Sequence, residues 1–275
     1  MKKNLLKGML VMAFAMFAMG TFAQGETKVL TASGDTWVRS SDPTKTWGST
    51  ATLEMKTDAN GEKVQNFYGL LSFAIPSTDE GYQVKSATLR LVTNYKKGDS
   101  KMRLYPLTSV VTNKTTYNDV ADQISSALEG DAIAEFAMKG NAQNSLSDKI
   151  AESFYTVDAW TNNIDVTASI KSLSSTTFSF FIVKVMDQVG KSNQIFSSRA
   201  TDVTNTKVTP NITFKAEDLV PQLTIVYEKS GATGISQVNA EKVADDAYYN
   251  LQGVKMNSDN LPRGIYIHQG KKVIK

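Results

Sequence analysis

Hydrophobic and polar residues alternate along much of this chain, and the clearest example lies in residues 84–107. Ala87, Leu89 and Leu91 fall on one side of its first half, and this period of two is typical of a half-buried strand. A second alternating half follows the turn-forming residues 94–100. The segment therefore predicts a β-hairpin. Because a hairpin with one apolar face is marginal alone, a second sheet should cover it, as in a β-sandwich.

Short segments of the same kind recur from residue 28 onward. The predicted strands are Asp35–Arg39, Ala51–Lys56, Phe67–Ile75, Val84–Thr93, Lys101–Leu107, Ile164–Ile170, Thr177–Lys184, Ile195–Arg199 and Gln222–Tyr227. Turn formers separate them and no helical segments alternate with them, which favours an all-β jelly-roll sandwich over a parallel α/β sheet. Residues 120–146 are the exception, and they hold either a short helix at residues 122–128 or a long surface excursion.

The same alternation predicts which side chains fill the space between the two sheets. They are Leu53, Met55, Leu71, Phe73, Leu89, Leu91, Leu104, Phe180, Ile182, Leu223 and Ile225. With an apolar fraction of 41%, the chain has enough hydrophobic residues for one large core.

The two ends of the chain differ from this body. Residues 1–23 combine a basic start, an apolar run and a small-residue end, which predicts a secretory signal peptide cleaved before Gln24. The apolar run is short for a bilayer, and no later stretch is long and apolar enough to span one. The body at residues 24–229 should pass through a linker at 230–235 into a small C-terminal β appendage at 236–275.

Charge and composition exclude several classes of protein. The net charge of +3 disappears once the three lysines of the leader are removed, and the body is then slightly acidic. A nucleic-acid partner is therefore not expected. The chain has no cysteine and one histidine, His268, so thiol chemistry, disulfides and zinc–cysteine sites are excluded and a Ser-His-Asp triad nearly so.

The three tryptophans are candidates for stacking on sugar rings. Trp47 and Trp160 lie in predicted loops, where each either plugs an end of the sandwich or stacks on a sugar. Trp37 shares a strand face with Arg39. Either both side chains face solvent as a platform beside a cation, or Trp37 lies in the core with Arg39 at its margin.

Several cations recur on the predicted strands, namely Arg39, Lys56, Arg90, Arg103 and Arg199. On one sheet face they would suit the carboxylates of uronic acids, which arginine can bind through two parallel hydrogen bonds. The alternative is a solvated face with cross-strand ion pairs.

Two further groups of carboxylates give weaker indications of a metal site or a catalytic site. Residues 58–62 carry oxygens that suit calcium but lack the spacing of an EF-hand, and their Asn-Gly pair indicates a hairpin turn instead. No cofactor is expected, with structural calcium left open. The acids between Asp119 and Glu135 indicate a surface loop more than the paired carboxylates of a glycosidase.

Ordered segments of the body resemble a known family. They are DTWVRSSDPTKTWGSTATLEMK at 35–56, YGLLSFAIP at 68–76, VKSATLRLVTN at 84–94, the Thr116–Asp119 turn, IDVTASI at 164–170, IFSSRATD at 195–202 and PQLTIVYE at 221–228. Together they resemble the DNRLRE-type domain, which is grouped with the family 96 carbohydrate-binding modules. The resemblance implies a jelly-roll sandwich without catalytic residues.

The tail resembles a second family. YYNLQGVKM at 248–256 and LPRGIYIHQGKKVIK at 261–275 are similar to the C-terminal sorting domain of the type IX secretion system. This resemblance implies that the secretion machinery is a partner and that the protein is secreted or attached to the cell surface.

These observations predict a secreted, non-catalytic carbohydrate-binding protein, with a uronate-containing polysaccharide as the expected ligand. The expected binding residues are Trp37, Arg39, Trp47, Lys56, Arg90, Trp160 and Arg199. The alternative is a cell-surface structural or adhesive protein that binds other proteins, and a polysaccharide-degrading enzyme is the least favoured hypothesis.

Overall fold

The computed structural model describes residues 25–57, 66–98, 100–185, 192–230 and 247–275, apart from 252, 258, 259 and 270. The chain separates into two compact units, Met1–Gly231 and Ala232–Lys275. Three segments named above lie wholly or mostly outside the described residues: the leader at 1–23, the Asn-Gly turn at 58–62 and the linker at 230–235.

Two antiparallel sheets form the sandwich in the described part of the first unit, and the short pair β12 (Val203–Asn205) and β13 (Ile212–Phe214) makes a separate two-stranded sheet. The larger sheet has the order β1 (Thr27–Thr31), β14 (Gln222–Lys229), β5 (Tyr82–Lys96), β11 (Asn193–Phe196) and β3 (Thr52–Met55), and β8 (Asn144–Ser145) and β9 (Thr161–Asp165) also pair with β5. The smaller sheet has the order β2 (Gly34–Arg39), β4 (Phe67–Ala74), β10 (Thr177–Lys184), β6 (Lys101–Leu107) and β7 (Ala134–Ala137). The all-β sandwich prediction is confirmed.

The core lies between the two sheets. Every side chain predicted to face the interior belongs to this one cluster and is buried, including Leu89 and Leu91 on β5 and Phe73 on β4. The alternation of the strands explains this result, because side chains two residues apart share one face of a sheet.

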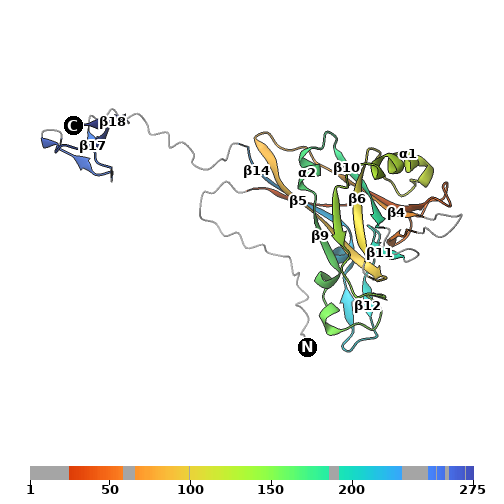
Figure 1. The fold of residues 1–275 in the computed structure, drawn as a ribbon. Coiled ribbons are helices and arrows are strands. Elements are labelled where there is room, and N and C mark those ends of the chain that lie inside the picture. The colour runs from red at the N-terminus through yellow and green to blue at the C-terminus, as the bar shows by residue number, and fades with distance from the viewer. Residues whose placement is uncertain are drawn as a thin grey trace, which may run out of the picture. The chain divides into compact units, whose positions relative to one another are not determined.

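Each sheet is also covered on its outer face. The helix α1 (Tyr117–Leu128) buries Val120 and Ile124 against the smaller sheet (Figure 1). On the outer face of the larger sheet, Val92 and Phe196 belong to a third buried apolar cluster. The chain that covers it carries η1 (Glu152–Phe154), η2 (Val157–Trp160), β12 (Val203–Asn205), β13 (Ile212–Phe214) and α3 (Ala216–Leu219). The outer strand faces are therefore interior surfaces over much of their area.

The predicted hairpin at residues 84–107 is wrong. Both strands exist, but β5 lies in the larger sheet and β6 in the smaller one, so the turn between them carries the chain across the sandwich. Their apolar faces meet across the core, where Leu89 and Leu104 belong to the same cluster. A period of two identifies the buried face of a strand but does not identify its neighbour.

Two other predicted strands are too long. The strand expected at residues 164–170 ends at Asp165, whose carboxylate accepts a hydrogen bond from the backbone N–H of Thr167 at 2.9 Å. This bond starts the short helix α2 (Thr167–Lys171). The strand expected at residues 195–199 ends at Phe196, and a turn follows it.

The excursion after residue 116 contains a longer helix than expected. The carboxylate of Asp119 accepts hydrogen bonds from the backbone N–H and the hydroxyl of Thr116, both at 2.8 Å. An acidic side chain that binds the N-cap residue in this way starts a helix, so α1 begins before residue 122.

The second unit is a small antiparallel sheet in the order β16 (Lys255–Met256), β15 (Tyr248–Tyr249), β17 (Ile265–His268) and β18 (Lys271–Ile274) among its described residues. Tyr266 is buried, and the rings of Tyr248 and His268 stack with centroids 4.1 Å apart. In the described part of the chain no helix is long and apolar enough to cross a membrane.

Truncation of the inter-sheet core should be costly. Replacing Leu89 or Phe73 by alanine should lower the free energy of unfolding by about 2 to 5 kcal/mol, because each removes fully buried apolar atoms. Urea denaturation measures this loss. Val29→Ala is the matched control, because that side chain is 59% exposed and its loss should change stability by about 0.5 kcal/mol or less. Urea midpoints of Leu89→Ala and Phe73→Ala that equal those of the wild type and of Val29→Ala would contradict the assigned core.

Stability should also fall in alkali through Tyr68 on β4. Burial, with a contribution from Tyr117, raises the pKa of Tyr68 to about 12. An unfolded tyrosine ionises near pH 10, so between about pH 10 and 12 the unfolded state binds fewer protons and the free energy of unfolding falls as pH rises. Tyr68→Phe should remove about 2 kcal/mol of that fall, measured by urea denaturation at pH 9 and 11.5. An unchanged slope in the variant would contradict this account.

Candidate functional site

An aromatic cluster lies at the edge of the sandwich where the edge strands β2 and β3 come together. The rings of Trp37 and Trp47 stack with centroids 4.2 Å apart and planes inclined by 17°, and Phe67 lies 5.4 Å from Trp37. Trp37 is 6% exposed, whereas Trp47 is partly exposed. We call these three residues the Trp47 cluster; Trp47 lies on its outer side because the buried Trp37 ring supports it from the core.

The loop that carries Trp47 is held in place by backbone contacts. The hydroxyl of Thr50 donates to the carbonyl of Thr52 at 2.7 Å, and the N–H of Asn118 donates to the carbonyl of Pro43 at 3.0 Å. A β-carbon on Gly48 would collide with the backbone carbonyl of Asn113, so only glycine fits directly after Trp47. The ring is therefore presented by a well-packed loop.

Cations gather on the Trp47 cluster. The ammonium of Lys45 lies 3.9 Å from the centroid of Trp47, and the guanidinium of Arg39 lies 5.0 Å from it and 5.7 Å from that of Phe67. Lys56 lies 5.5 Å from Phe67. These distances are in the range of cation–π interactions. Because Trp37 already covers one face of Trp47 at 4.2 Å, Lys45 must lie over the other face.

Two polar atoms of this site have no hydrogen-bond partner among the described residues, although both are shielded from solvent. They are the indole Nε1 of Trp47 and the Nε of Arg39, whose terminal nitrogen pairs with the carboxylate of Asp42. Buried donors of this kind are normally satisfied. These two donors lie beneath the surface of the site, and a ligand reaches them only after the side chains that cover them move.

Three of the seven predicted binding residues, Arg39, Trp47 and Lys56, come together here. Trp37 belongs to the site as the support of Trp47, and its burial rules out the exposed platform with Arg39. It lies in the core with Arg39 at the margin, which is the second of the two interpretations of this strand.

The other three predicted residues do not join the exposed surface of the cluster. Trp160 is fully buried and donates from Nε1 to the carbonyl of Phe154 at 3.0 Å, so it plugs the covering layer of the larger sheet. Arg90 donates to the carbonyl of Asp218 at 2.6 Å, and burial lowers the pKa of Arg90. Its side chain thus fastens α3 to β5.

Arg199 holds the turn after β11 against β2. It pairs with the carboxylate of the fully buried Asp35 and donates to the carbonyl of the same residue at 3.0 Å. The other carboxylate oxygen of Asp35 accepts the N–H of Ser198 at 2.5 Å. The prediction that Arg199 projects from a strand is therefore wrong, because Asp35 draws its segment into a turn.

Lys45 and Phe67 were not among the predicted binding residues. Lys45 precedes Trp47 by two residues in a polar loop, and such a loop gives no sign of the side chain's direction. Phe67 lies in a strand that reads as core, and it does belong to the core. The residue types alone do not show that both contact the same two tryptophans and cations.

Two of the acids from Asp119 to Glu135 have a pKa shifted away from what a catalytic acid needs. Hydrogen bonds from Thr116 lower the pKa of Asp119, and the hydrogen bond from Arg103 lowers the pKa of Glu135. A catalytic acid needs a raised pKa instead. Among the described residues no cluster of three or more acidic or histidine side chains could hold a metal ion.

The segment that contains the Trp47 cluster matches the model of a known protein family. Residues 26–119 match the model of carbohydrate-binding module family 96, and this range contains the whole Trp47 cluster with Arg39, Lys45 and Lys56. The match covers the first part of the sandwich. A search of curated proteins gave no match.

Breaking the Asp35–Arg199 pair should test its structural role. Arg199→Ala leaves a buried carboxylate without its cation and should lower the free energy of unfolding by about 3 kcal/mol. Lys215→Ala removes an exposed partner of Asp202 and is the control, which should lose far less stability because solvent screens that pair. Thermal or urea denaturation measures both losses, and an unchanged stability of Arg199→Ala would contradict the structural role.

Proposed function

We propose that this chain is a non-catalytic carbohydrate-binding protein that binds an acidic polysaccharide at the Trp47 cluster. The observation that carries the proposal is the partly exposed Trp47 ring, stacked on Trp37 and contacted by Lys45 and Arg39, within the segment that matches a carbohydrate-binding module family. Flat aromatic faces suit the apolar side of a pyranose ring, and the cations suit a carboxylate.

The position of Lys45 favours an acidic sugar over a neutral one. A sugar that stacks on Trp47 must displace the Lys45 ammonium from the ring face. That displacement removes a cation–π contact worth about 0.5 to 1 kcal/mol at an exposed site. A uronate gives the displaced ammonium a carboxylate partner, whereas a neutral sugar gives it none. Arg39 and Lys56 add positive charge at the same edge.

The proposal includes export. The leader pattern at residues 1–23 supports secretion, and the resemblance of residues 236–275 to type IX sorting domains supports delivery to the cell surface with that machinery as a partner. No cofactor is part of the proposal. A polysaccharide-binding protein on the surface would hold an extracellular acidic glycan close to the cell.

Affinity electrophoresis should test the proposal. The purified protein should be retarded in gels that contain alginate or polygalacturonate, and retardation should weaken as salt is raised because exposed charges are screened. Arg39→Ala and Lys45→Ala should each weaken binding about two- to fivefold, which corresponds to about 0.4 to 1 kcal/mol and lies within the range for exposed charge pairs. Trp47→Ala should weaken it at least as much.

The matched control for the lysine is Lys101→Ala, an exposed cation on β6 that pairs with Glu135 and should leave retardation unchanged. Circular dichroism spectra should show that every variant keeps the fold. Retardation by alginate that is insensitive to Trp47→Ala, Arg39→Ala and Lys45→Ala would contradict this site, and absence of retardation in both acidic gels would contradict the acidic ligand.

A further inference from the structure

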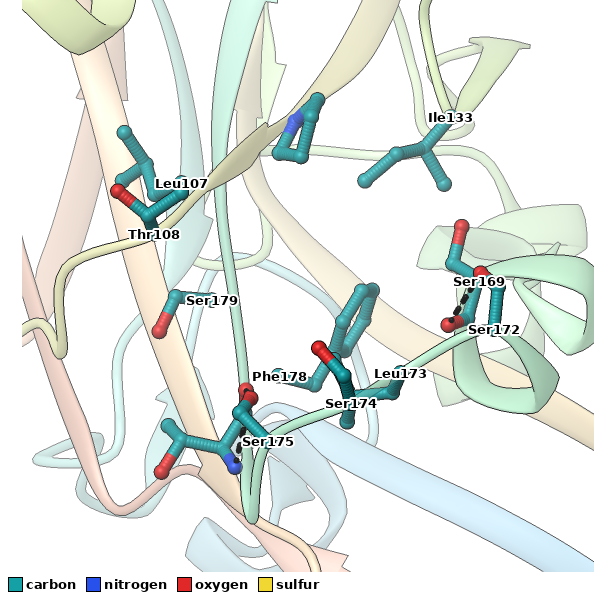
Figure 2. A pocket seen from close by; sticks show the side chains of 12 residues that line it. Leu107, Thr108, Ile133, Ser169, Ser172, Leu173, Ser174, Ser175, Phe178 and Ser179 are labelled. Carbon is teal, nitrogen blue, oxygen red and sulfur yellow. Dashed lines mark hydrogen bonds between the residues drawn. The ribbon is translucent and has the colours of Figure 1, made fainter.

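Away from the Trp47 cluster, a hollow lies at one end of the sandwich, beside α1 and α2. Its volume is about 470 Å³, and its walls come from the end of β6, the start of β10 and the segment from α2 to Thr177 (Figure 2). A neighbouring hollow of about 400 Å³ lies against α1, and Pro106 and Thr108 line both. The two spaces together run from α2 across the end of β6 to α1.

The strand register separates this hollow from the Trp47 cluster. Phe178, which lines the hollow, pairs with Phe73 near one end of β10. Ile182 pairs with Gly69, which pairs in turn with Trp37. Four residues of a strand span about 13 Å, so the hollow and the aromatic cluster are different places on the sandwich.

The hollow combines an apolar floor with a rim of hydroxyl groups. Leu173 and Ile133 supply partly exposed apolar surface above the buried ring of Phe178, and five serines and two threonines supply hydroxyls. Within the described structure the hydroxyls of Ser169 and Ser174 donate no hydrogen bond and accept none, so they are available to a ligand.

Charge distinguishes this hollow from the Trp47 cluster most clearly. None of the described residues that line the larger space is charged, and the one charged residue that lines the smaller space is Asp122, a carboxylate. A uronate would therefore find no cation here and would face a like charge. Hydroxyls and a carboxylate instead match the donors and acceptors of an uncharged sugar.

We propose that this hollow is a second carbohydrate site, and that it binds an uncharged oligosaccharide. Its volume lies within the range of about 300 to 1,000 Å³ that is typical of small-molecule sites. The sugar rings would lie on Leu173 and Ile133, which are partly exposed, and Ser169 and Ser174 would bond their hydroxyls. This inference stands apart from the acidic site, because it uses different residues and the opposite charge requirement.

The test uses affinity electrophoresis of the purified protein in gels that contain xylan, mixed-linkage β-glucan, galactomannan or laminarin. At least one of these neutral glycans should retard the protein, and retardation should be nearly independent of salt. The double variant Ser169→Ala, Ser174→Ala should weaken that retardation about tenfold, because two hydrogen bonds are lost. Ser174→Trp, which places a large ring at the rim, should weaken it further.

The controls separate this proposal from the acidic site. Ser125→Ala removes an exposed hydroxyl of α1 that does not line either hollow, and it should bind as the wild type does. Arg39→Ala combined with Lys45→Ala should weaken retardation by alginate more than either change alone and leave retardation by the neutral glycan unchanged. Absence of retardation in all four neutral gels would overturn the proposal, and so would neutral retardation that survives both serine variants.

Discussion

Apolar packing on both faces of each sheet is the constraint that determines where this protein can bind a ligand. Leu89 and Phe73 meet in the core between the sheets, while Val92 and Phe181 are buried on the outer faces under further chain. The flat outer faces are thereby occupied over much of their area. The places left for a ligand in the described structure are the edges and ends of the sandwich, where the Trp47 cluster and the serine-rimmed hollow lie.

The two places have opposite chemistry. At the edge, one tryptophan supports another and cations lie on the outer ring, which is the basis for proposing a carboxylate-bearing ligand there. At the end, hydroxyls surround an apolar floor and the charged side chain in the adjoining space is a carboxylate. A polysaccharide that alternates or mixes acidic and neutral sugars would satisfy both, and β10 spans the distance between the two sites.

The sequence predicts the core of this fold well because a strand buries every second residue. It predicts the partners of strands poorly, as β5 and β6 show, because a turn with an Asn, a Gly and an Asp can join two sheets as readily as it joins two strands of one sheet. The spatial grouping of the candidate binding residues was predicted in part. Arg39, Trp47 and Lys56 do come together. Trp160 instead is buried and donates to the carbonyl of Phe154, six residues earlier, and Arg199 pairs with Asp35, which is distant in sequence.

The most direct test of the account is the indole N–H signals of the three tryptophans in an NMR titration with hexameric polyguluronate. The Nε1 of Trp47 lacks a partner in the described structure, whereas that of Trp160 is bonded to a buried carbonyl. The account predicts that the Trp47 signal moves as ligand is added and that the Trp160 signal stays in place. A Trp47 signal that does not move at saturating ligand would contradict it.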